Sequence, residues 1–171
     1  HCMLRDDWGV NAIRLAMYTE EYNGYCSGGS QAKLRKQVDK GIGYATDLGM
    51  YAIIDWHILS DGNPNKNKSQ AKKFFTTMAK KYKNNKNVIY EICNEPNGCS
   101  WKEIKSYATD IIKTIRKYDK KAVIIVGTPM NIFRQRLLMQ ERRSFRSLYL
   151  SLVYHRPVAM EPLTRHPQTN G

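Results

Sequence analysis

The chain has 171 residues, of which 42% are hydrophobic, and a formal net charge of +13. This length and apolar content suffice for one domain with a packed core, and no apolar run approaches the roughly 18 residues of a membrane-spanning helix. A charge of this size would suggest a nucleic-acid partner if the lysines were clustered among aromatic residues that stack on bases. They are instead spread over three predicted helices, between the apolar positions, which favours a solvated outer surface without a nucleic-acid partner or a membrane partner.

The first part of the chain alternates predicted strands and helices. Residues 1–9 are typical of the end of a helix, and residues 11–18 are typical of a short strand. Ser30 is a good N-cap residue, and apolar side chains at every third or fourth position predict a helix from there to Gly49. Residues 50–57 follow as a second strand, apolar until its carboxyl end turns polar.

The alternation continues in the next segment. Residues 58–68 are rich in Asn, Asp, Gly and Pro, which predicts a loop, and Ser69 is expected to open the next helix. An apolar run from Asn87 predicts a buried strand with Glu95 at its carboxyl end. We expect the strand to stop there because Pro96 has no amide hydrogen to donate to the sheet.

A third helix and a fourth strand complete the regular part. Ser100 and Glu103 form a capping box before an amphipathic run, and residues 121–128 are typical of a strand. An alternation that repeats every roughly 35–40 residues predicts parallel strands joined by right-handed crossovers. An eightfold β/α barrel and a doubly wound sheet both fit, but no Gly-rich phosphate-binding turn follows a strand, which counts against a nucleotide-binding sheet.

Polar residues stand at the carboxyl ends of three predicted strands, and in a barrel such ends meet around one cleft. Glu95 would be half-desolvated there, so that its pKa can be tuned for proton transfer. The neighbouring Asn94 amide can donate to a substrate hydroxyl. The polar residues at these ends are Arg14, Tyr18, Asp55, His57, Asn94 and Glu95.

Each candidate also has a structural interpretation. Taken in isolation, Glu95 is better explained as a cap of the loop that follows it, and His57 as a structural hydrogen-bonding group. Arg14 can instead be explained as the positive charge that neutralises a carboxylate inside a barrel, either Asp55 or Glu91. A sugar platform needs an exposed ring face, so a place in the core is the alternative for the aromatic candidates, Tyr18 and Trp56.

Four cysteines, Cys2, Cys26, Cys93 and Cys99, have no CxxC or Cys/His metal spacing, so the sequence implies no metal site. Cys93 lies in the predicted core strand, where a cysteine acts as a small hydrophobic residue. A bridge between Cys26 and Cys99 would join two loops but is only weakly suggested.

The composition changes after Thr128. From Met130 to Gly171 there are seven arginines and no lysine, whereas the preceding residues hold seventeen lysines and four arginines. We therefore divide the chain into residues 1–129, one partial catalytic domain, and residues 130–171, an unassigned tail. The abrupt change suggests a different origin for the tail, such as a shift of reading frame, which resequencing across the codon for Pro129 tests.

Five stretches of the first segment resemble a known family in their order and spacing: Leu4–Gly9, Ile13–Glu20, Asp47–Gly62, Val88–Gly98 and Ile124–Pro129. They resemble the glycoside hydrolase family 5 cellulases, in particular endoglucanases. The resemblance implies an α/β fold that is part of a (β/α)8 barrel, from about the second strand to the fifth.

The resemblance also implies a chemistry: endo-hydrolysis of β-1,4-glucan with retention, by two carboxyls about 5–5.5 Å apart. Glu95 would be the general acid/base, Asn94 would hold the sugar 2-hydroxyl, and Arg14 would orient the nucleophile. The remaining implied residues bind glucose units beside the cleaved bond: His57, Tyr18 and Trp56.

The chain departs from the family pattern at the nucleophile, a second glutamate expected after a later strand. The only acids after Thr128 are Glu141 and Glu161, in segments that match nothing in the family, so no nucleophile is recognisable. The resemblance further implies a secreted monomer without a cofactor, acting on cellulose or mixed-linkage glucan. Two alternatives stay open: an inactive or carbohydrate-binding fragment of such an enzyme, and a basic nucleic-acid binder.

Overall fold

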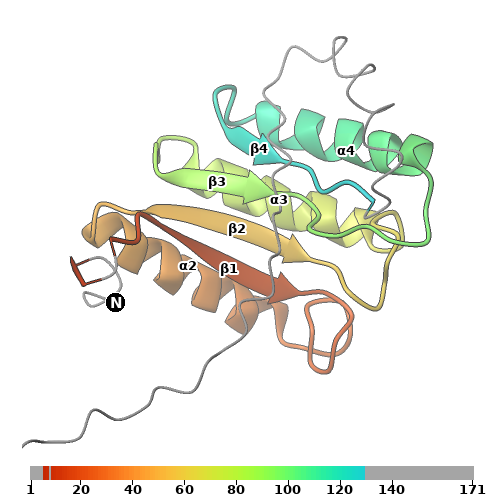
Figure 1. Cartoon of the computed structure of the whole chain (residues 1–171), viewed down its shortest axis with the longest axis horizontal. Coiled ribbons are helices and arrows are strands. Elements are labelled where there is room, and N and C mark those ends of the chain that lie inside the picture. Colours follow the sequence, from red (N-terminus) through yellow and green to blue (C-terminus); the bar gives the residue numbers. More distant parts are fainter. Residues whose placement is uncertain (1–5, 8, 130–171) are drawn as a thin grey trace, which may run out of the picture.

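The structure, a computed structural model, describes residues 6–7 and 9–129. Four strands form one parallel sheet in the order β1-β2-β3-β4, and three helices lie behind it, all on the same face (Figure 1). The predicted alternation is confirmed. In chain order the elements are β1 (Ala12–Tyr18), α2 (Gln31–Asp47), β2 (Tyr51–His57), α3 (Lys68–Tyr82), β3 (Val88–Glu91), α4 (Trp101–Arg116) and β4 (Val123–Ile125).

Two of the three helix starts agree with the sequence. Ser30 caps α2, its side chain accepting a hydrogen bond from the amide of Lys33, and Ser100 forms the predicted capping box with Glu103. The prediction for α3 was wrong by one residue: it begins at Lys68, with Asn67 as N-cap. The Asn67 side chain makes no cap hydrogen bond, because it is engaged with carboxylates of two loops.

The third strand ends earlier than predicted. β3 stops at Glu91, four residues before Glu95, and Pro96 is therefore not what ends it. The physical reason is a change of register after the pair of Glu91 and Ile125. The amide of Ile92 still donates to the Ile125 carbonyl at 3.0 Å, but the Ile92 carbonyl accepts from the Tyr107 hydroxyl at 2.6 Å, so the next amide of the facing segment, that of Gly127, donates to Cys93 instead.

A glycine holds the segment after β3 against the segment after β4. The amide of Gly127 donates to the Cys93 carbonyl at 2.8 Å. A Cβ at position 127 would lie 1.9 Å from the carbonyl oxygen of Asn94, so only glycine fits without moving the backbone. This close approach fixes the main chain immediately before Glu95.

The hydrophobic core lies between the sheet and the helices. Alternate residues of β2 on that face, Ala52, Ile54 and Trp56, are fully buried. Aromatic residues dominate the centre, where the Trp56 and Phe74 rings lie 5.4 Å apart. The opposite face of the sheet carries the polar residues of the strands.

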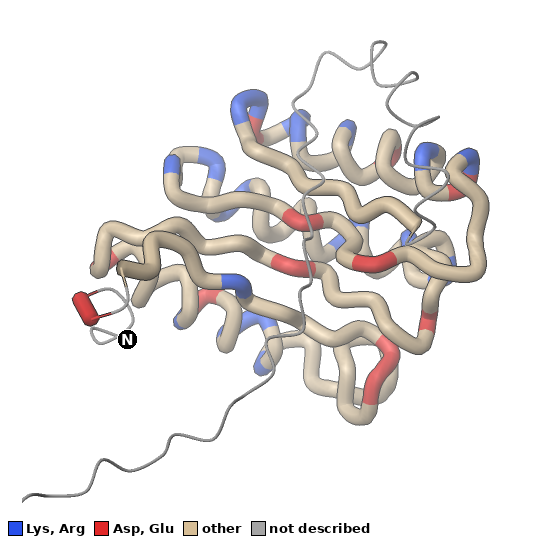
Figure 2. Tube along the Cα trace, in the orientation of Figure 1, with Lys and Arg blue, Asp and Glu red and all other residues tan. Residues whose placement is uncertain are grey.

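Basic residues gather along the helices and on loops at one end of the sheet, while acidic residues occur on neighbouring strands (Figure 2). Nearly all lysines of the three helices are exposed, which confirms the predicted solvated surface. Within the described residues, no helix is long and apolar enough to cross a membrane.

Cys93 is fully buried, as predicted for a small hydrophobic residue, and burial raises the pKa of its thiol far above its ordinary value. Cys26 and Cys99 are both free, so the weakly suggested bridge is not formed. Cys2, most of the helix end predicted for residues 1–9, and the tail of residues 130–171 lie outside the described residues.

Candidate active site

The carboxyl ends of β1, β2 and β3 bring together the polar residues that the sequence singled out. The parallel register sets Tyr18 beside His57, and Asp55 between Ala16 and Glu91. Since side chains alternate along a strand, the polar residues point to the face of the sheet that the helices leave free. The site is therefore one continuous cluster across three strands.

Arg14 connects two carboxylates at the centre of the cluster. Its Nε donates to Oε2 of Glu91 at 2.7 Å and its Nη2 donates to Oε1 at 2.8 Å, so the two side chains form a bidentate ion pair. Nε also lies 3.2 Å from Oδ2 of Asp55. Burial alone would lower the Arg14 pKa, but the bonds to Glu91 and the nearby charges of Asp55 and Glu95 raise it.

Asp55 links this pair to the histidine. Its side chain is fully buried, and Oδ2 lies 2.7 Å from Nδ1 of His57, which donates to it. Oδ1 has no hydrogen-bond partner among the described residues. Burial and the nearby Glu91 raise the pKa of Asp55 to about 6, against the opposing effects of His57 and Arg14.

Asn94 completes the cluster on the third strand's side. Its Oδ1 accepts a hydrogen bond from the amide of Ile58 at 2.8 Å, which fixes the orientation of the side-chain amide. Its Nδ2 consequently faces Nε2 of His57, at 3.5 Å. Since Nδ1 of His57 donates to Asp55, Nε2 is left as the acceptor for this contact.

Glu95 follows Asn94 in the loop after β3 and is half-buried. Its charge contributes to the raised pKa of Arg14, which lies across the sheet on β1. The loop is held from its far side, where the amide of Asn97 donates to the carbonyl of Gly62 at 2.9 Å. Arg14, His57 and Asn94 thus form one connected group beside Glu95, whose catalytic role stays a prediction.

The two aromatic candidates have different surroundings. Tyr18 is 44% exposed, and its ring meets the ring of His57 edge-on at 4.5 Å between centroids. Trp56 is 0% exposed and packs against Phe74 and Phe75 in the core. A buried ring has no face for a sugar, so the expectation that Trp56 binds substrate is corrected and its core alternative holds.

Some residues of the site were not among the sequence candidates. Glu91 was considered only as a structural partner of Arg14, yet both of its carboxylate oxygens accept short hydrogen bonds in the cluster. Thr19 and Asp61, both buried, hold the adjoining loops. For Glu91 the signal was available, because it shares the strand face and the predicted sheet end with Asp55. For the loop residues no periodic pattern points to a role.

In the described part of the chain, no group of three or more His, Cys, Asp or Glu side chains is arranged to hold a metal ion. The arrangement consists of carboxylates, a guanidinium, an imidazole and an amide, which suits proton transfer and hydrogen bonding to hydroxyl groups.

Comparisons with known proteins identify the family of the chain. The model of the family described as cellulase (glycosyl hydrolase family 5) matches residues 3–149. Endoglucanase A of Butyrivibrio fibrisolvens is 55% identical over 129 residues, which are 74% of this chain and 30% of that protein. An endoglucanase of Clostridium saccharobutylicum is 58% identical over 127 residues, which are 73% of this chain and 28% of that protein. This chain thus spans less than a third of the length of either relative.

Solved structures give the same result for the fold. The catalytic domain of endoglucanase Cel5A of Thermobifida fusca matches with a TM-score of 0.70 at 44% identity, covering 74% of this chain and 41% of that chain. The cellulase Cel5C_n matches with a TM-score of 0.73 at 41% identity, covering 75% and 42%. The partial α/β barrel is confirmed. Since the family model covers most of its residues, the chain belongs to the cellulases of glycosyl hydrolase family 5.

Proposed function

We propose that the chain is the part of an endo-β-1,4-glucanase that carries the acid/base of a retaining hydrolysis, with a β-glucan chain as substrate. The observation that carries the proposal is the unbroken series of contacts from Asn94 through His57 and Asp55 to Arg14. This series supports the proposal because an amide, an imidazole and a guanidinium then act together near Glu95, whose charge affects Arg14. The relatives named endoglucanases support the same reaction.

In the proposed first step, the protonated Glu95 carboxyl gives its proton to the glycosidic oxygen as the bond from that oxygen to the anomeric carbon breaks. A second carboxylate forms an ester with the anomeric carbon, and water then hydrolyses this ester with Glu95 acting as base. We propose that Asn94 donates to the sugar hydroxyl next to the anomeric carbon. Arg14 then supplies positive charge near the attacking carboxylate. The second carboxylate is not identified in this chain.

The substrate side of the proposal rests on the exposed residues of the cluster. Tyr18 is the exposed one of the two aromatic candidates, and together with the adjoining His57 it suits contact with a glucose unit. A Thermobifida fusca Cel5A structure is described as a complex with cellotetraose, which supports a chain of β-1,4-linked glucose here. We propose that the enzyme acts as a monomer outside the cell, like a secreted polysaccharide hydrolase.

The test supplies an external nucleophile. The purified 171-residue chain is incubated with an activated aryl cellobioside, with and without azide or formate as an external nucleophile. We expect aryl release that depends on the added anion, because a small nucleophile takes the place of the second carboxylate of the proposed reaction. Release is expected to fall by at least about tenfold in Arg14→Lys and His57→Gln. The matched control is Asp47→Asn, an exposed carboxylate at the end of α2, which should leave release unchanged.

A second candidate function is sugar binding without hydrolysis, favoured because we identify no second catalytic carboxylate beside the cluster among residues 6–7 and 9–129. Calorimetric titration with cellotetraose separates the two: binding without anion-dependent release supports the binding fragment. Neither binding nor release from a chain that circular dichroism shows to be folded would contradict both. A nucleic-acid binder would instead show duplex affinity that falls steeply with salt.

A further inference from the structure

We infer that Asp61 is a positioning residue of the proposed sugar site, acting through the backbone of the segment that carries His57. Asp61 lies in the loop between β2 and α3 and is 7% exposed. A carboxylate so far from water is stable when several donors surround it. The donors around Asp61 come from both loops that border the site, which is what gives it a function beyond its own loop.

The chain leaves the sheet at His57. From there, one backbone group in each of three consecutive residues makes a hydrogen bond to another part of the structure. The carbonyl of His57 accepts from the Thr19 amide at 3.2 Å. The amide of Ile58 donates to Asn94, and the amide of Leu59 donates to Oδ1 of Asp61 at 3.0 Å. Three consecutive residues are therefore fixed, the first by β1's continuation, the second by the site itself and the third by Asp61.

The other oxygen of Asp61 reaches the loop after β1. Oδ2 accepts a hydrogen bond from Oγ1 of Thr19 at 2.8 Å, a bond that is buried. Thr19 directly follows Tyr18, whose ring meets His57. Asp61 thus connects Thr19, which follows Tyr18, to Leu59, the second residue after His57. Through the backbone it restrains the positions of both rings.

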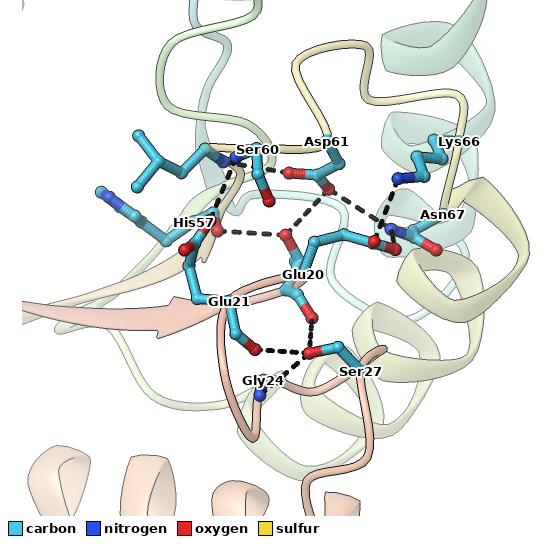
Figure 3. A network of polar contacts seen from close by, with 11 residues as sticks. Glu20, Glu21, Gly24, Ser27, His57, Ser60, Asp61, Lys66 and Asn67 are labelled. Carbon is cyan, nitrogen blue, oxygen red and sulfur yellow. Dashed lines mark hydrogen bonds and ion pairs between the residues drawn. The ribbon is translucent and has the colours of Figure 1, made fainter.

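An outer layer of contacts surrounds this core of the network (Figure 3). The Nδ2 of Asn67 donates to Oε1 of Glu20 at 2.7 Å and lies 3.3 Å from Oδ2 of Asp61. Lys66 pairs with Glu20 at 3.0 Å, and the bonds from Asn67 and Lys66 lower the Glu20 pKa. Ser60 closes the layer, its amide donating to Glu21 at 3.1 Å.

The two layers differ in what they can contribute. Lys66 is 54% exposed, so its pair with Glu20 competes with water and is expected to add little. The bond between Thr19 and Asp61 is shielded from water, so its loss leaves a buried group without its partner. The positioning effect therefore belongs to Asp61 and Thr19 rather than to the exposed charges.

This inference rests on the proposed function for its effect on sugar binding, but its effect on His57 can be measured without a sugar. The full chain is prepared with ¹⁵N-labelled histidine, and the His57 imidazole signals are assigned by their loss in His57→Gln. We expect these signals to shift in Asp61→Asn and in Thr19→Val, and to return toward the wild-type positions in Thr19→Ser, which retains the hydroxyl. Cellotetraose affinity is expected to fall about tenfold in the two variants whose signals shift.

The matched control is Asp39→Asn. Asp39 also joins two elements, but on the helix side: it lies on α2, accepts from the Tyr82 hydroxyl and pairs with Lys81, both on α3. The Asp39→Asn substitution should lower the melting temperature. It should leave the His57 signals unchanged and the cellotetraose affinity unchanged within about twofold.

The outcomes separate the inference from the proposed function. Unchanged His57 signals in a folded Asp61→Asn variant would overturn the positioning role, whether or not the variant binds cellotetraose. Shifted signals in a chain whose wild type does not bind cellotetraose would retain the positioning role and count against the glucan site. If Asp61→Asn does not fold, the contrast between Thr19→Val and Thr19→Ser decides, and equal spectra of these two would overturn the role.

Discussion

The two faces of the sheet use the same strands for different purposes. On the helix side, β2 contributes Ala52, Ile54 and Trp56, all without exposed surface, to an apolar layer. On the free side the same strand contributes Asp55 and His57, which hydrogen bond to each other. Burial of apolar area stabilises the first face, while the second carries ionised groups that need partners to offset their desolvation. The pleat of the strands therefore separates the face that stabilises the fold from the face that carries the chemistry.

The largest expected effect is on the helix side. Phe74 is fully buried and packs against Trp56, Tyr25 and Phe75. Phe74→Ala should lower the free energy of unfolding by about 3–5 kcal/mol, because it removes a large apolar side chain and leaves a cavity. Urea unfolding followed by circular dichroism measures the change.

The matched change on the free side is Tyr18→Ala. Tyr18 is 44% exposed, so its removal should cost less than about 1 kcal/mol of stability. A loss as large as that of Phe74→Ala would mean that the free face also stabilises the fold, and the separation of the two faces would be wrong.

The second effect concerns the glycine that holds the segment carrying the site. In Gly127→Ala the new Cβ would overlap the carbonyl oxygen of Asn94, so the backbone has to shift, at a cost of about 2–3 kcal/mol. Because Asn94 moves, cellotetraose binding should weaken as well.

The control is Gly43→Ala in α2, where a Cβ meets nothing within 4 Å. There alanine should stabilise the helix by up to about 1 kcal/mol and leave binding unchanged. Equal effects of the two substitutions would refute the role of the close approach.

The helix side was predictable from the sequence because its signals are local. Apolar residues such as Ala71, Phe74 and Met78 repeat with the period of a helix, and the Ser100 capping box lies within four residues. The alternation of side chains along a strand could also have assigned Trp56 to the core. Its neighbours Asp55 and His57 face the free side, so Trp56 has to face the helices.

The free side was predictable in its composition but not in its geometry. The residues at the strand ends were identified, since parallel strands end at a common edge. The end of β3 was not, because it depends on contacts of Ile92 and Cys93 with Tyr107 and Gly127, which lie far along the chain. Asp61 was missed for a related reason: a buried carboxylate in a loop has no period, and only the fold reveals that Thr19 lies beside it.

The smallest effect tests the charge balance on the free side. The folded chain raises the pKa of Asp55 to about 6, above the ordinary 3.8, so the folded state holds a proton more readily than the unfolded state between these values. Stability from Asp55 is therefore complete below about pH 4 and is lost as the pH rises through 6. Asp55→Asn cannot titrate, so its unfolding free energy relative to wild type should improve by about 1 kcal/mol between pH 5 and pH 7. Repeating the pair of measurements in a His57→Gln background removes the neighbouring imidazole from the titration. A relative stability that stays constant over this range, or that falls with pH, would mean that Arg14 and His57 compensate the buried charge of Asp55 completely.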